Sequence, residues 1–397
     1  MATNASFKPS LRVQTAPLPT PSASTTRAMA TPPMTPLPSS AFADWGTVSP
    51  GVVARTASDL ASARRRALVE TPACPMGSCS EDVERGSRVS LGSGAWSAVV
   101  RGTLASKEGK TTVAIKKPCY PGADKVLRQE AEILAYITAA APSDSIVKFF
   151  GFEPTTSTVV MEYVPGMTLA DYARGSRRKR AELKTGLTTA VKSQPVMGLS
   201  KWLDLSAQLV DAFVHLKRTG VVHGDVTWHN VLIKESQTES GVKLMPVVID
   251  FSSGHLDVEG YRPGPVSATT TAFCSPELLE AHIRRPITPP LSPADKPAQD
   301  DHGPCPTYAS DLYGLAMTLL SAAIGTEVYE NAGRHGGIYA RQGQPLEWVR
   351  NGEAFLIVGV RTALSKSLMG CFGRVAEKRV AVEELRDRLV SHIDSSI

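Results

Sequence analysis

A glycine-containing turn in the first third of the chain has the composition of a phosphate-binding loop. Gly92 and Gly94 are separated by one residue and lie between two segments that read as β-strands. Glycine has no Cβ, so the backbone N–H groups of such a turn can come close to phosphate oxygens. A dinucleotide-binding fold would need a helix directly after the glycines, whereas a strand pattern follows here. The segment therefore predicts a strand–turn–strand cover over phosphates.

A lysine and a glutamate follow at a spacing that can pair them. Lys116 ends the strand-like sequence 113–116, and Glu130 comes fourteen residues later within a helical pattern. A strand lysine held by a helix glutamate is rigidly placed against the α- and β-phosphates of a nucleotide. Glu132 is a second acid in the same helix, but its spacing to the apolar residues that follow favours Glu130 as the partner.

Two aspartates and an asparagine further along have the types needed for a base and a metal site. Asp225 and Asn230 lie five residues apart, and Asp250 follows the short apolar strand pattern Val247–Ile249. A carboxylate can accept the proton of an attacking hydroxyl, and carboxylate and amide oxygens suit Mg²⁺. These residues predict a phosphoryl-transfer site.

Taken in order, the motifs resemble those of eukaryotic-type protein kinases. The resemblance covers about residues 86–395. Ser275–Glu277 stands where the family has Ala-Pro-Glu, Asp311 opens the helix that anchors the catalytic loop, and Arg379 stands where the family places the partner of Glu277. The divergent motifs and the low-complexity start of the chain also resemble those of kinases of large DNA viruses such as herpesviruses.

The resemblance implies an α+β, two-lobed protein kinase fold. A small β-rich N-lobe with one main helix is expected over residues 86–164, and a larger, mainly helical C-lobe over 165–397. It also implies ATP and Mg²⁺ as cofactors, transfer of the γ-phosphoryl group to Ser or Thr hydroxyls, and protein substrates as partners. A membrane partner and direct nucleic-acid binding are not expected, because no long apolar run is present and the net charge of +5 is a mild excess.

Carried over position by position, the resemblance assigns a role to each site residue. Asp225 is the catalytic base, Lys116 holds the phosphates with Glu130 orienting it, and Asn230 and Asp250 are the metal ligands. The nucleotide contacts that it implies are Leu91, Gly92, Ser93, Gly94, Ala95, Trp96, Ser97, Val99, Ala114, Lys116, Met161, Glu162, Val164 and Leu232.

Four positions depart from the family pattern. Ser97 stands in place of the third loop glycine, and Gly224 stands in place of the Arg before the catalytic Asp. Thr227 stands where serine/threonine kinases have a Lys that contacts the γ-phosphate, and Ser252 stands in place of the last glycine of Asp-Phe-Gly. None of them removes a metal ligand, the phosphate-binding lysine or the base, so activity is expected. Thr227 leaves the choice between Ser/Thr and Tyr open.

Two alternatives to a protein kinase remain. The departures allow a catalytically weak pseudokinase that acts as a scaffold. His223–Asp225 also resembles the His-Gly-Asp of aminoglycoside and choline kinases, which would make the chain a small-molecule phosphotransferase. Ser275–Glu277 and Arg379 belong to the protein-substrate shelf of the family and argue against this second alternative.

The elements that must position these residues are visible in the hydrophobic pattern. Strand-like runs precede and follow one helical segment, and a mainly helical part comes after them. His223 is expected to hydrogen-bond the backbone near the catalytic loop, and Thr270 to make a fixed contact with that loop. The expected strands are Ser87–Leu91, Ala98–Gly102, Thr112–Lys116, Thr158–Tyr163, Val231–Ile233 and Val247–Ile249, and the expected helices are Ser58–Val69, Lys125–Ala139, Leu199–Leu216 and Asp311–Ile324.

Composition bounds the remaining segments. The chain has 397 residues, 42% of them hydrophobic, which is enough for a sizeable core. Its first fifty residues hold nine Pro and fifteen Ser or Thr, so residues 1–85 are expected to be a disordered tail. Residues 174–198 (basic) and 284–306 (Pro-rich) are expected to be surface loops.

The cysteines and the charged runs bear on location. Six scattered cysteines without a Cys-x-x-Cys pair predict reduced thiols in an intracellular protein, cytoplasmic or nuclear. The run Arg177–Arg180 fits a nuclear import signal or a docking patch for acidic partners, with a solvated loop as the simpler interpretation. The absence of acidic residues before Asp44 also fits an organellar transit peptide, although a plain flexible tail is favoured.

Overall fold

A computed structural model of the chain describes residues 79–84, 87–106, 109–140, 142–183, 188–238, 241–257, 270–284, 305–330 and 332–395. All of them belong to one compact unit, Thr31–Ile397. The expected helix at 58–69, the tail up to residue 78 and the Pro-rich insert from 285 to 304 lie outside the described residues.

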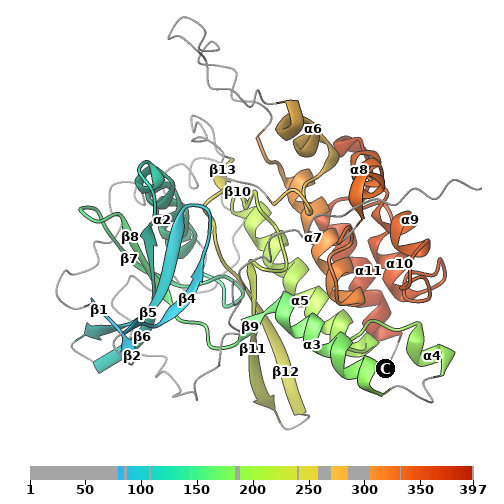
Figure 1. Ribbon diagram of the computed structural model, residues 1–397, viewed down its shortest axis with the longest axis horizontal. Coiled ribbons are helices and arrows are strands. Elements are labelled where there is room, and N and C mark those ends of the chain that lie inside the picture. Colours follow the sequence, from blue (N-terminus) through green and yellow to red (C-terminus); the bar gives the residue numbers. More distant parts are fainter. Residues whose placement is uncertain are drawn as a thin grey trace, which may run out of the picture. The chain divides into compact units, whose positions relative to one another are not determined.

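An antiparallel sheet forms the strand-rich part (Figure 1). Its main path runs β1-β5-β6-β8-β7, and β4 pairs with β5 beside β1. Long alternating segments build the two central strands, whose register places Val99 opposite Lys116. The strands are β1 Cys79–Glu81, β4 Ser90–Ser93, β5 Ser97–Ser106, β6 Gly109–Pro118, β7 Phe149–Glu153 and β8 Thr158–Glu162.

The expected boundary of the N-terminal tail at residue 85 is wrong. Strand β1 pairs with β5 from Cys79↔Leu104 to Glu81↔Gly102, and β2 (Val83–Glu84) and β3 (Ser87–Arg88) form a small hairpin between β1 and β4. Charge pairing holds this segment: Arg101 of β5 donates to Asp82 at 2.7 Å and to Glu84 at 2.6 Å. The folded part therefore begins before residue 86.

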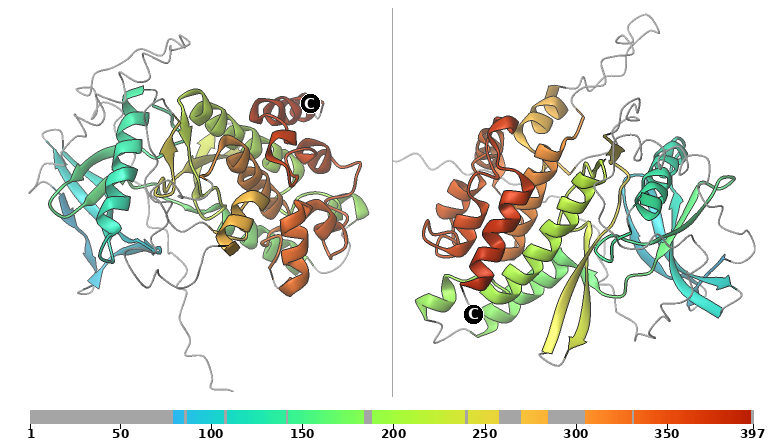
Figure 2. Two further views of the ribbon diagram at one scale, coloured as in Figure 1. Left: turned by 90° about the horizontal axis from the view of Figure 1, so that it is seen from above. Right: turned by 180° about the vertical axis from the view of Figure 1, so that it is seen from behind.

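One long helix, α2 (Ala123–Ala140), packs against this sheet (Figure 2). Its apolar residues recur at helical spacing, and Leu127, Ala131 and Leu134 are buried against the strands. The Tyr136 hydroxyl donates to the carbonyl of Thr219 at 2.7 Å, which joins α2 to the end of a helix in the second part of the fold. This helix carries Glu130 towards the site.

The second part of the fold is mainly helical. Helices α5 and α7 lie side by side at its centre and are lined by apolar residues, and Thr307 begins α7 with a capping box. Thr168 caps α3 by accepting from Asp171. The helices are α3 Leu169–Glu182, α4 Thr189–Lys192, α5 Leu199–Arg218, α6 Pro276–Arg284, α7 Tyr308–Ile324, α8 Gly333–Gln342, α9 Pro345–Arg350, α10 Ala363–Leu368, the 3-10 turn Ala376–Lys378 and α11 Val382–Asp394.

Two small sheets hold the segments between these helices. In the first, β11 (Val231–Thr238) pairs with both β12 (Gly241–Val248) and β9 (Met167–Thr168). In the second, β10 (Val221–Val222) pairs with β13 (His255–Leu256). The catalytic-loop sequence lies between β10 and β11, and Asp250 lies between β12 and β13, so the two sheets bring these segments together.

The expected loop at 174–198 is also corrected. Helix α3 continues through Glu182 and includes the basic run Arg177–Arg180, and α4 follows. Lys, Arg and Ala are good helix formers. Arg180 also donates to the carbonyls of Gln194 at 2.7 Å and Pro195 at 3.2 Å, which fastens the end of the helix to the following loop. A charge run that looked solvated is thus partly a structural element.

A single cluster of buried hydrophobic residues reaches from α2 and the sheet into α5 and α7.

None of the described helices is long and apolar enough to span a bilayer. Within the described ranges, Cys119, Cys305 and Cys371 are not joined in disulfides.

Candidate functional site

The glycine turn joins two strands, as its sequence indicates. The Gly94 N–H donates to the carbonyl of Ser97 at 2.8 Å, and β4 pairs directly with β5 through Gly92↔Val99. A Cβ built on Gly94 would meet no atom within 4 Å, so this corner of the turn has open space beside it. The following segment is the strand β5 and not a helix, which excludes a dinucleotide-binding turn.

Three charged side chains from distant parts of the chain meet below this turn. Lys116 Nζ lies 2.9 and 2.7 Å from the two carboxylate oxygens of Glu130 and 2.8 Å from Asp250 Oδ1. The side chains of Lys116 and Glu130 are buried, whereas that of Asp250 is 37% exposed. The Glu130 carboxylate also accepts from the N–H of Phe251 at 3.2 Å, so the helix glutamate holds both the lysine and the segment after Asp250. The predicted pair of Lys116 and Glu130 is therefore formed.

The charges of this triad are set by burial and by each other. Burial alone would lower the pKa of Lys116, but Asp250 and Glu130 outweigh it and raise the pKa above its usual value. Burial would raise the pKa of Asp250, but Lys116 outweighs that effect and the pKa falls to about 2. Burial raises the pKa of Glu130, and the nearby Asp250 adds to the rise. The site thus holds a fixed cation beside an ionised, partly exposed carboxylate.

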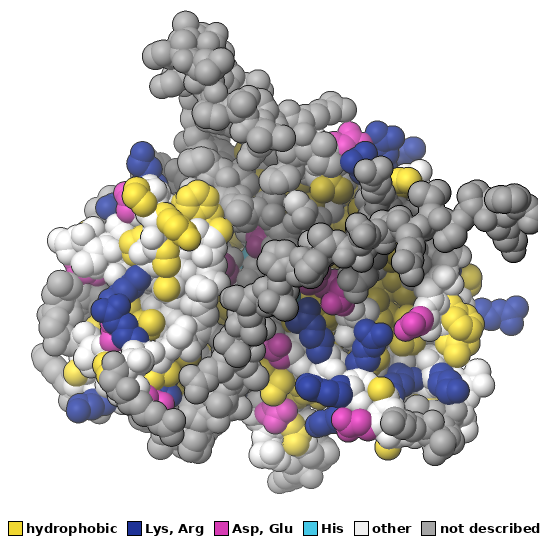
Figure 3. All heavy atoms as spheres, in the orientation of Figure 1, with side chains coloured by type: hydrophobic (Ala, Val, Ile, Leu, Met, Phe, Trp, Pro, Cys, Tyr) yellow, Lys and Arg dark blue, Asp and Glu magenta, His cyan; other side chains and the backbone are white. Residues whose placement is uncertain are grey.

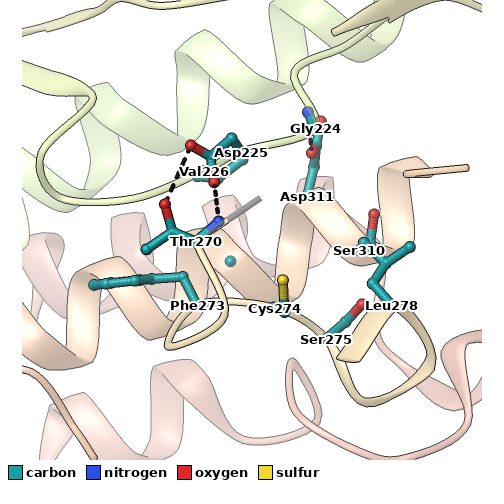
Figure 4. Close-up of a pocket in the computed structure, with 11 residues that line it drawn as sticks. Gly224, Asp225, Val226, Thr270, Phe273, Cys274, Ser275, Leu278, Ser310 and Asp311 are labelled. Carbon is teal, nitrogen blue, oxygen red and sulfur yellow. Dashed lines mark hydrogen bonds between the residues drawn. The ribbon is translucent and has the colours of Figure 1, made fainter. Parts of the chain in front are cut away.

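The candidate base Asp225 is held by Thr270, as Figure 4 shows, and also by Asn230. The backbone N–H of Thr270 donates to Oδ1 at 2.9 Å, and the Thr270 hydroxyl lies 3.3 Å from Oδ2. Asn230 donates from Nδ2 to Oδ2 at 3.1 Å and to the Asp225 carbonyl at 2.9 Å. The expected contact of Thr270 with the catalytic loop is therefore present. Because the Asn230 amide nitrogen is used here, its carbonyl oxygen remains the group that can face a cation.

Burial raises the pKa of Asp225 to about 6, with the Thr270 bonds opposing the rise and the charge of Asp250 adding to it. A base must be ionised, so we expect kcat/KM for peptide phosphorylation to fall as the pH drops through about 6. Thr270→Val removes a hydrogen bond that favours the charged form, and it should move the midpoint of this fall to higher pH.

The measurement is kcat/KM between pH 5 and 8 for the wild type, Thr270→Val and the neighbouring control Thr271→Val. Titration of the nucleotide is common to all three and cancels in the comparison. If Thr270→Val leaves the midpoint of the fall unchanged or lowers it, the loss of kcat/KM at low pH does not reflect protonation of Asp225.

A buried carboxylate fixes the backbone of the catalytic loop. Asp311 accepts from the N–H groups of His223 at 2.7 Å and Gly224 at 2.9 Å, and burial raises its pKa to about 7. The His223 ring lies 3.1 Å from the carbonyl of Ile249, and its centre is 4.8 Å from that of the Phe251 ring, with the two rings tilted by 49°. Burial lowers the pKa of His223 to about 4, so the ring is neutral and structural, as expected.

Gly224 is required by its conformation. Its φ is +80°, and a Cβ there would lie 2.2 Å from the carbonyl oxygen of Ser253. Asp250 also has a positive φ, of 65°, which is uncommon outside glycine. The position where the family carries an arginine thus has no room for a side chain in this conformation.

The residues expected at the adenine end gather at the edge of the core. Ala114, Met161 and Val164 are buried, and Leu91, Val99 and Leu232 are half-buried against the same cluster. The Glu162 N–H already donates to the carbonyl of Lys148 at 2.8 Å, so its carbonyl is the group left for a ligand. Val164 is buried, and no backbone carbonyl of the described residues accepts from its N–H, so this N–H is a candidate donor to a ligand. The arrangement fits a planar heterocycle with both a donor and an acceptor.

A pocket that the sequence did not indicate opens beside Asp225 (Figure 4). It lies between the catalytic loop, the segment before α6 and the start of α7. Both Asp225 and Thr270, whose N–H donates to the Asp225 carboxylate, line it. The lining includes Asp225, Val226, Thr270, Cys274, Leu278 and Gly314.

The candidate metal ligands from the sequence are Asn230 and Asp250. The described residues hold no cluster of three His, Cys, Asp or Glu side chains that could bind a metal. Mg²⁺ in phosphoryl-transfer sites is commonly held by one or two protein oxygens together with substrate phosphates. The donor set therefore fits Mg²⁺ bound with a nucleotide rather than a resident metal.

The start of α6, which forms the shelf beyond the pocket, is joined by an ion pair to the C-terminal part of the chain. Arg379 Nη1 and Nη2 donate to the two oxygens of Glu277 at 2.8 and 2.5 Å. Arg379 also donates to the carbonyls of Ala309 and Gly373, and its guanidinium lies 5.1 Å from the centre of the Tyr313 ring. The expected bidentate pair is confirmed.

Comparison with known proteins agrees with the site. Residues 87–282 match a family model described as protein tyrosine and serine/threonine kinase. The serine/threonine-protein kinase ISR1 of Saccharomyces cerevisiae is 27% identical over 245 residues, which cover 57% of this chain and 49% of that protein. The chain thus matches about half the length of this relative.

Tyrosine kinases match as well. The tyrosine-protein kinase transforming protein ros of UR2 avian sarcoma virus and the proto-oncogene tyrosine-protein kinase ROS of Gallus gallus are each 26% identical over 167 residues, 40% of this chain. These alignments cover 38% and 6% of the two relatives. With its α+β architecture, its paired Lys116 and Glu130 and this family match, the chain belongs to the eukaryotic-type protein kinase superfamily.

Proposed function

We propose that the chain transfers the γ-phosphoryl group of Mg-ATP to Ser or Thr hydroxyls of protein substrates. The observation that carries the proposal is the assembled set of Lys116, Glu130 and Asp250 opposite Asp225 and Asn230. Phosphoryl transfer needs positioning and charge neutralisation more than covalent chemistry, and this set supplies both. The two parts of the fold would act as the two lobes of a kinase, with the nucleotide between them.

Each residue has a defined task in this proposal. Lys116 is held by Glu130 in a position to neutralise charge on the phosphates. Asn230 and Asp250 would hold Mg²⁺, which would offset the charge that develops on the transferred group. Asp225 would orient the acceptor hydroxyl and take up its proton, using the lone pairs that its bonds to Thr270 and Asn230 leave free.

Two contacts favour protein Ser/Thr hydroxyls. Thr270 lies against Asp225 through both its N–H and its hydroxyl, which narrows the approach and suits a short alcohol better than a phenol. The bond between Glu277 and Arg379 builds a rigid shelf beside the base, which suits a polypeptide more than a small molecule.

The experiment is a degenerate peptide library that carries Ser, Thr or Tyr acceptors, incubated with the purified chain, Mg²⁺ and γ-labelled ATP. Label should enter Ser and Thr peptides with the wild type and should be lost with Asp225→Asn. Label that enters only Tyr peptides would refute the acceptor assignment. Nucleotide binding with no transfer to any peptide would support a scaffold instead.

We further expect activity that does not require phosphorylation of the activation segment, residues 250–277. An arginine before the catalytic Asp commonly clamps a phosphate on this segment and orders it. Here Gly224 has neither the charge nor the space for such a clamp, and Thr270 is engaged with Asp225. Arg262, the only basic residue of the segment, lies outside the described residues.

This expectation is tested by phosphatase treatment of the purified chain and by the triple variant Ser267→Ala, Thr269→Ala and Thr271→Ala. Both should keep the activity of the untreated wild type towards an exogenous peptide. A collapse of activity in either one would mean that a basic group elsewhere supplies the clamp.

A further inference from the structure

Helix α3 is attached directly to the catalytic loop. Trp228, three residues after Asp225, is fully buried, and its carbonyl accepts from the N–H of Ala170 at 3.2 Å. The Arg174 guanidinium lies over the Trp228 ring, 4.8 Å from its centre. A cation held on a buried indole is fixed in place. The start of α3 and the segment that carries the base therefore form one surface.

This surface continues into the basic run of α3. Residues 174, 177 and 178 share one side of the helix by their spacing, and Lys179 is adjacent. Arg177, Arg178 and Lys179 are exposed, and the Arg174 side chain is 40% exposed. Lys and Arg side chains gather over the region where Figure 1 places α3 (Figure 3). We call these four side chains the α3 basic face.

Acidic neighbours compensate this charge only weakly. Arg174 lies 3.7 Å from Glu327, which His229 also approaches at 3.6 Å. Arg177 lies 3.7 Å from Glu353, whose side chain is 95% exposed. Ion pairs of this length at the surface contribute little to stability, so each arginine can readily leave its acid for a better partner.

The other charged groups of the helix do not change this balance. Arg178 and Lys179 form no ion pair with any residue that the structure describes. Asp171 accepts from the Thr168 hydroxyl at 2.8 Å at the start of the helix, and Glu182 is at its far end. The α3 basic face therefore carries an excess of positive charge beside the base.

We propose that the α3 basic face binds acidic residues of the protein substrate that flank the acceptor hydroxyl. The inference rests on the proposed kinase function and names a substrate class for the same site. A substrate hydroxyl at Asp225 places its flanking residues near the catalytic loop, to which Trp228 and Arg174 attach the basic face. A peptide is favoured over nucleic acid or a membrane because these cations are confined to a short stretch of one helix and the net charge of the chain is only +5.

The test variant is Arg178→Glu with Lys179→Glu, because these side chains are exposed and form no ion pair with the described residues. Arg174 and Arg177 are left in place, since Arg174 packs on Trp228 and Arg177 packs over Gly325. The matched control, Arg361→Glu with Lys366→Glu, makes the same change in charge at exposed positions at α10.

Three peptides with the acceptor that the library selects are compared, flanked by Glu, Ala or Lys. The wild type should prefer the Glu-flanked peptide. The test variant should raise KM for that peptide about tenfold, the size expected for two exposed charge pairs, with kcat and the Ala-flanked peptide unchanged. Added salt should weaken the wild-type preference, because exposed charges are screened. The control should behave as the wild type.

Binding of a fluorescent Glu-rich peptide without an acceptor, measured by anisotropy, gives a second readout that does not depend on turnover. If no peptide is phosphorylated, the proposed function fails, and the anisotropy still decides whether the basic face binds acid. Equal affinity for Glu- and Ala-rich peptides, or an equal loss in the control, would overturn the proposal. So would tighter binding of RNA or of phosphatidylserine vesicles that the test variant alone abolishes.

Discussion

Asp250→Ala and Lys116→Met should each lower kcat/KM for peptide phosphorylation by about a hundred- to a thousand-fold or more, the range found when one fixed electrostatic group is removed from an active site. Lys116 is a buried cation that Glu130 and Asp250 hold in place at distances of 2.7 to 2.9 Å. Asp250 is the one ionised carboxylate of this set that solvent reaches. Removing either group removes charge compensation where the phosphates would lie.

The fold should survive both changes. Without Lys116, the Glu130 carboxyl can take up a proton, because burial already raises its pKa, and it keeps the bond from the Phe251 N–H. Asp250→Asn separates charge from shape, since the side chain keeps its size and loses its charge. We expect it to be nearly as inactive as Asp250→Ala, with a melting curve close to that of the wild type.

Lys117→Met is the matched control for Lys116→Met. Lys117 is the next residue of β6, its side chain is 37% exposed, and it pairs with Glu81 on the other face of the strand. Turnover by Lys117→Met should stay within about twofold of the wild type, as is usual for a surface position. Near-wild-type turnover by Lys116→Met or Asp250→Ala, with an unchanged melting curve, would mean that the site is assigned wrongly.

The sequence predicts the polar centre of the site well because each residue there is limited by its chemistry. Lys116, Glu130, Asp225 and Asp250 need a specific functional group at a specific element, and their spacing in the chain reflects those elements. Their placement in the structure follows the expected order, and the contact between Thr270 and Asp225 was also foreseeable.

The sequence predicts less well what depends on partners far along the chain. Strand β1 follows a Pro-rich sequence, and only its pairing with β5 and the bonds of Arg101 show that Cys79–Glu81 and Asp82 belong to the fold. The basic run in α3 reads as a solvated loop until the carbonyls that accept from Arg180 are known. Gly224 reads as a missing arginine, whereas the nearby Ser253 carbonyl shows that no side chain fits there.

Removal of the Arg379 side chain should lower the free energy of unfolding by about 3–5 kcal/mol, the usual cost of breaking a buried ion pair by deleting one partner. The Arg379 side chain is 1% exposed and that of Glu277 is 30% exposed, so the lower end of this range is expected. Arg379→Ala also takes a donor from the carbonyls of Ala309 and Gly373 and a cation from the Tyr313 ring. Arg379→Lys keeps the positive charge but not the bidentate guanidinium, so it should lower the free energy of unfolding less than Arg379→Ala does.

Arg374→Ala is the matched control for Arg379→Ala, because it breaks the pair with Glu280, in which the arginine side chain is 66% exposed. An exposed pair contributes at most about 1 kcal/mol. Urea unfolding of both variants gives the two costs. A loss below about 1 kcal/mol for Arg379→Ala, equal to that of the control, would show that Glu277 and Arg379 do not meet in solution.

The pH dependence gives a second check on the same pair. Burial alone would raise the pKa of Glu277, but the bonds from Arg379 outweigh burial and lower it below its usual value. A carboxyl whose pKa is lowered by folding stabilises the fold above its unfolded pKa of about 4.3, and this contribution is lost as the pH falls through the folded value. The stability gap between wild type and Arg379→Ala should therefore be full at pH 7 and narrow below about pH 4. A gap that stays constant into that range would mean that packing of Arg379, and not its charge, ties the shelf to the C-terminal helices.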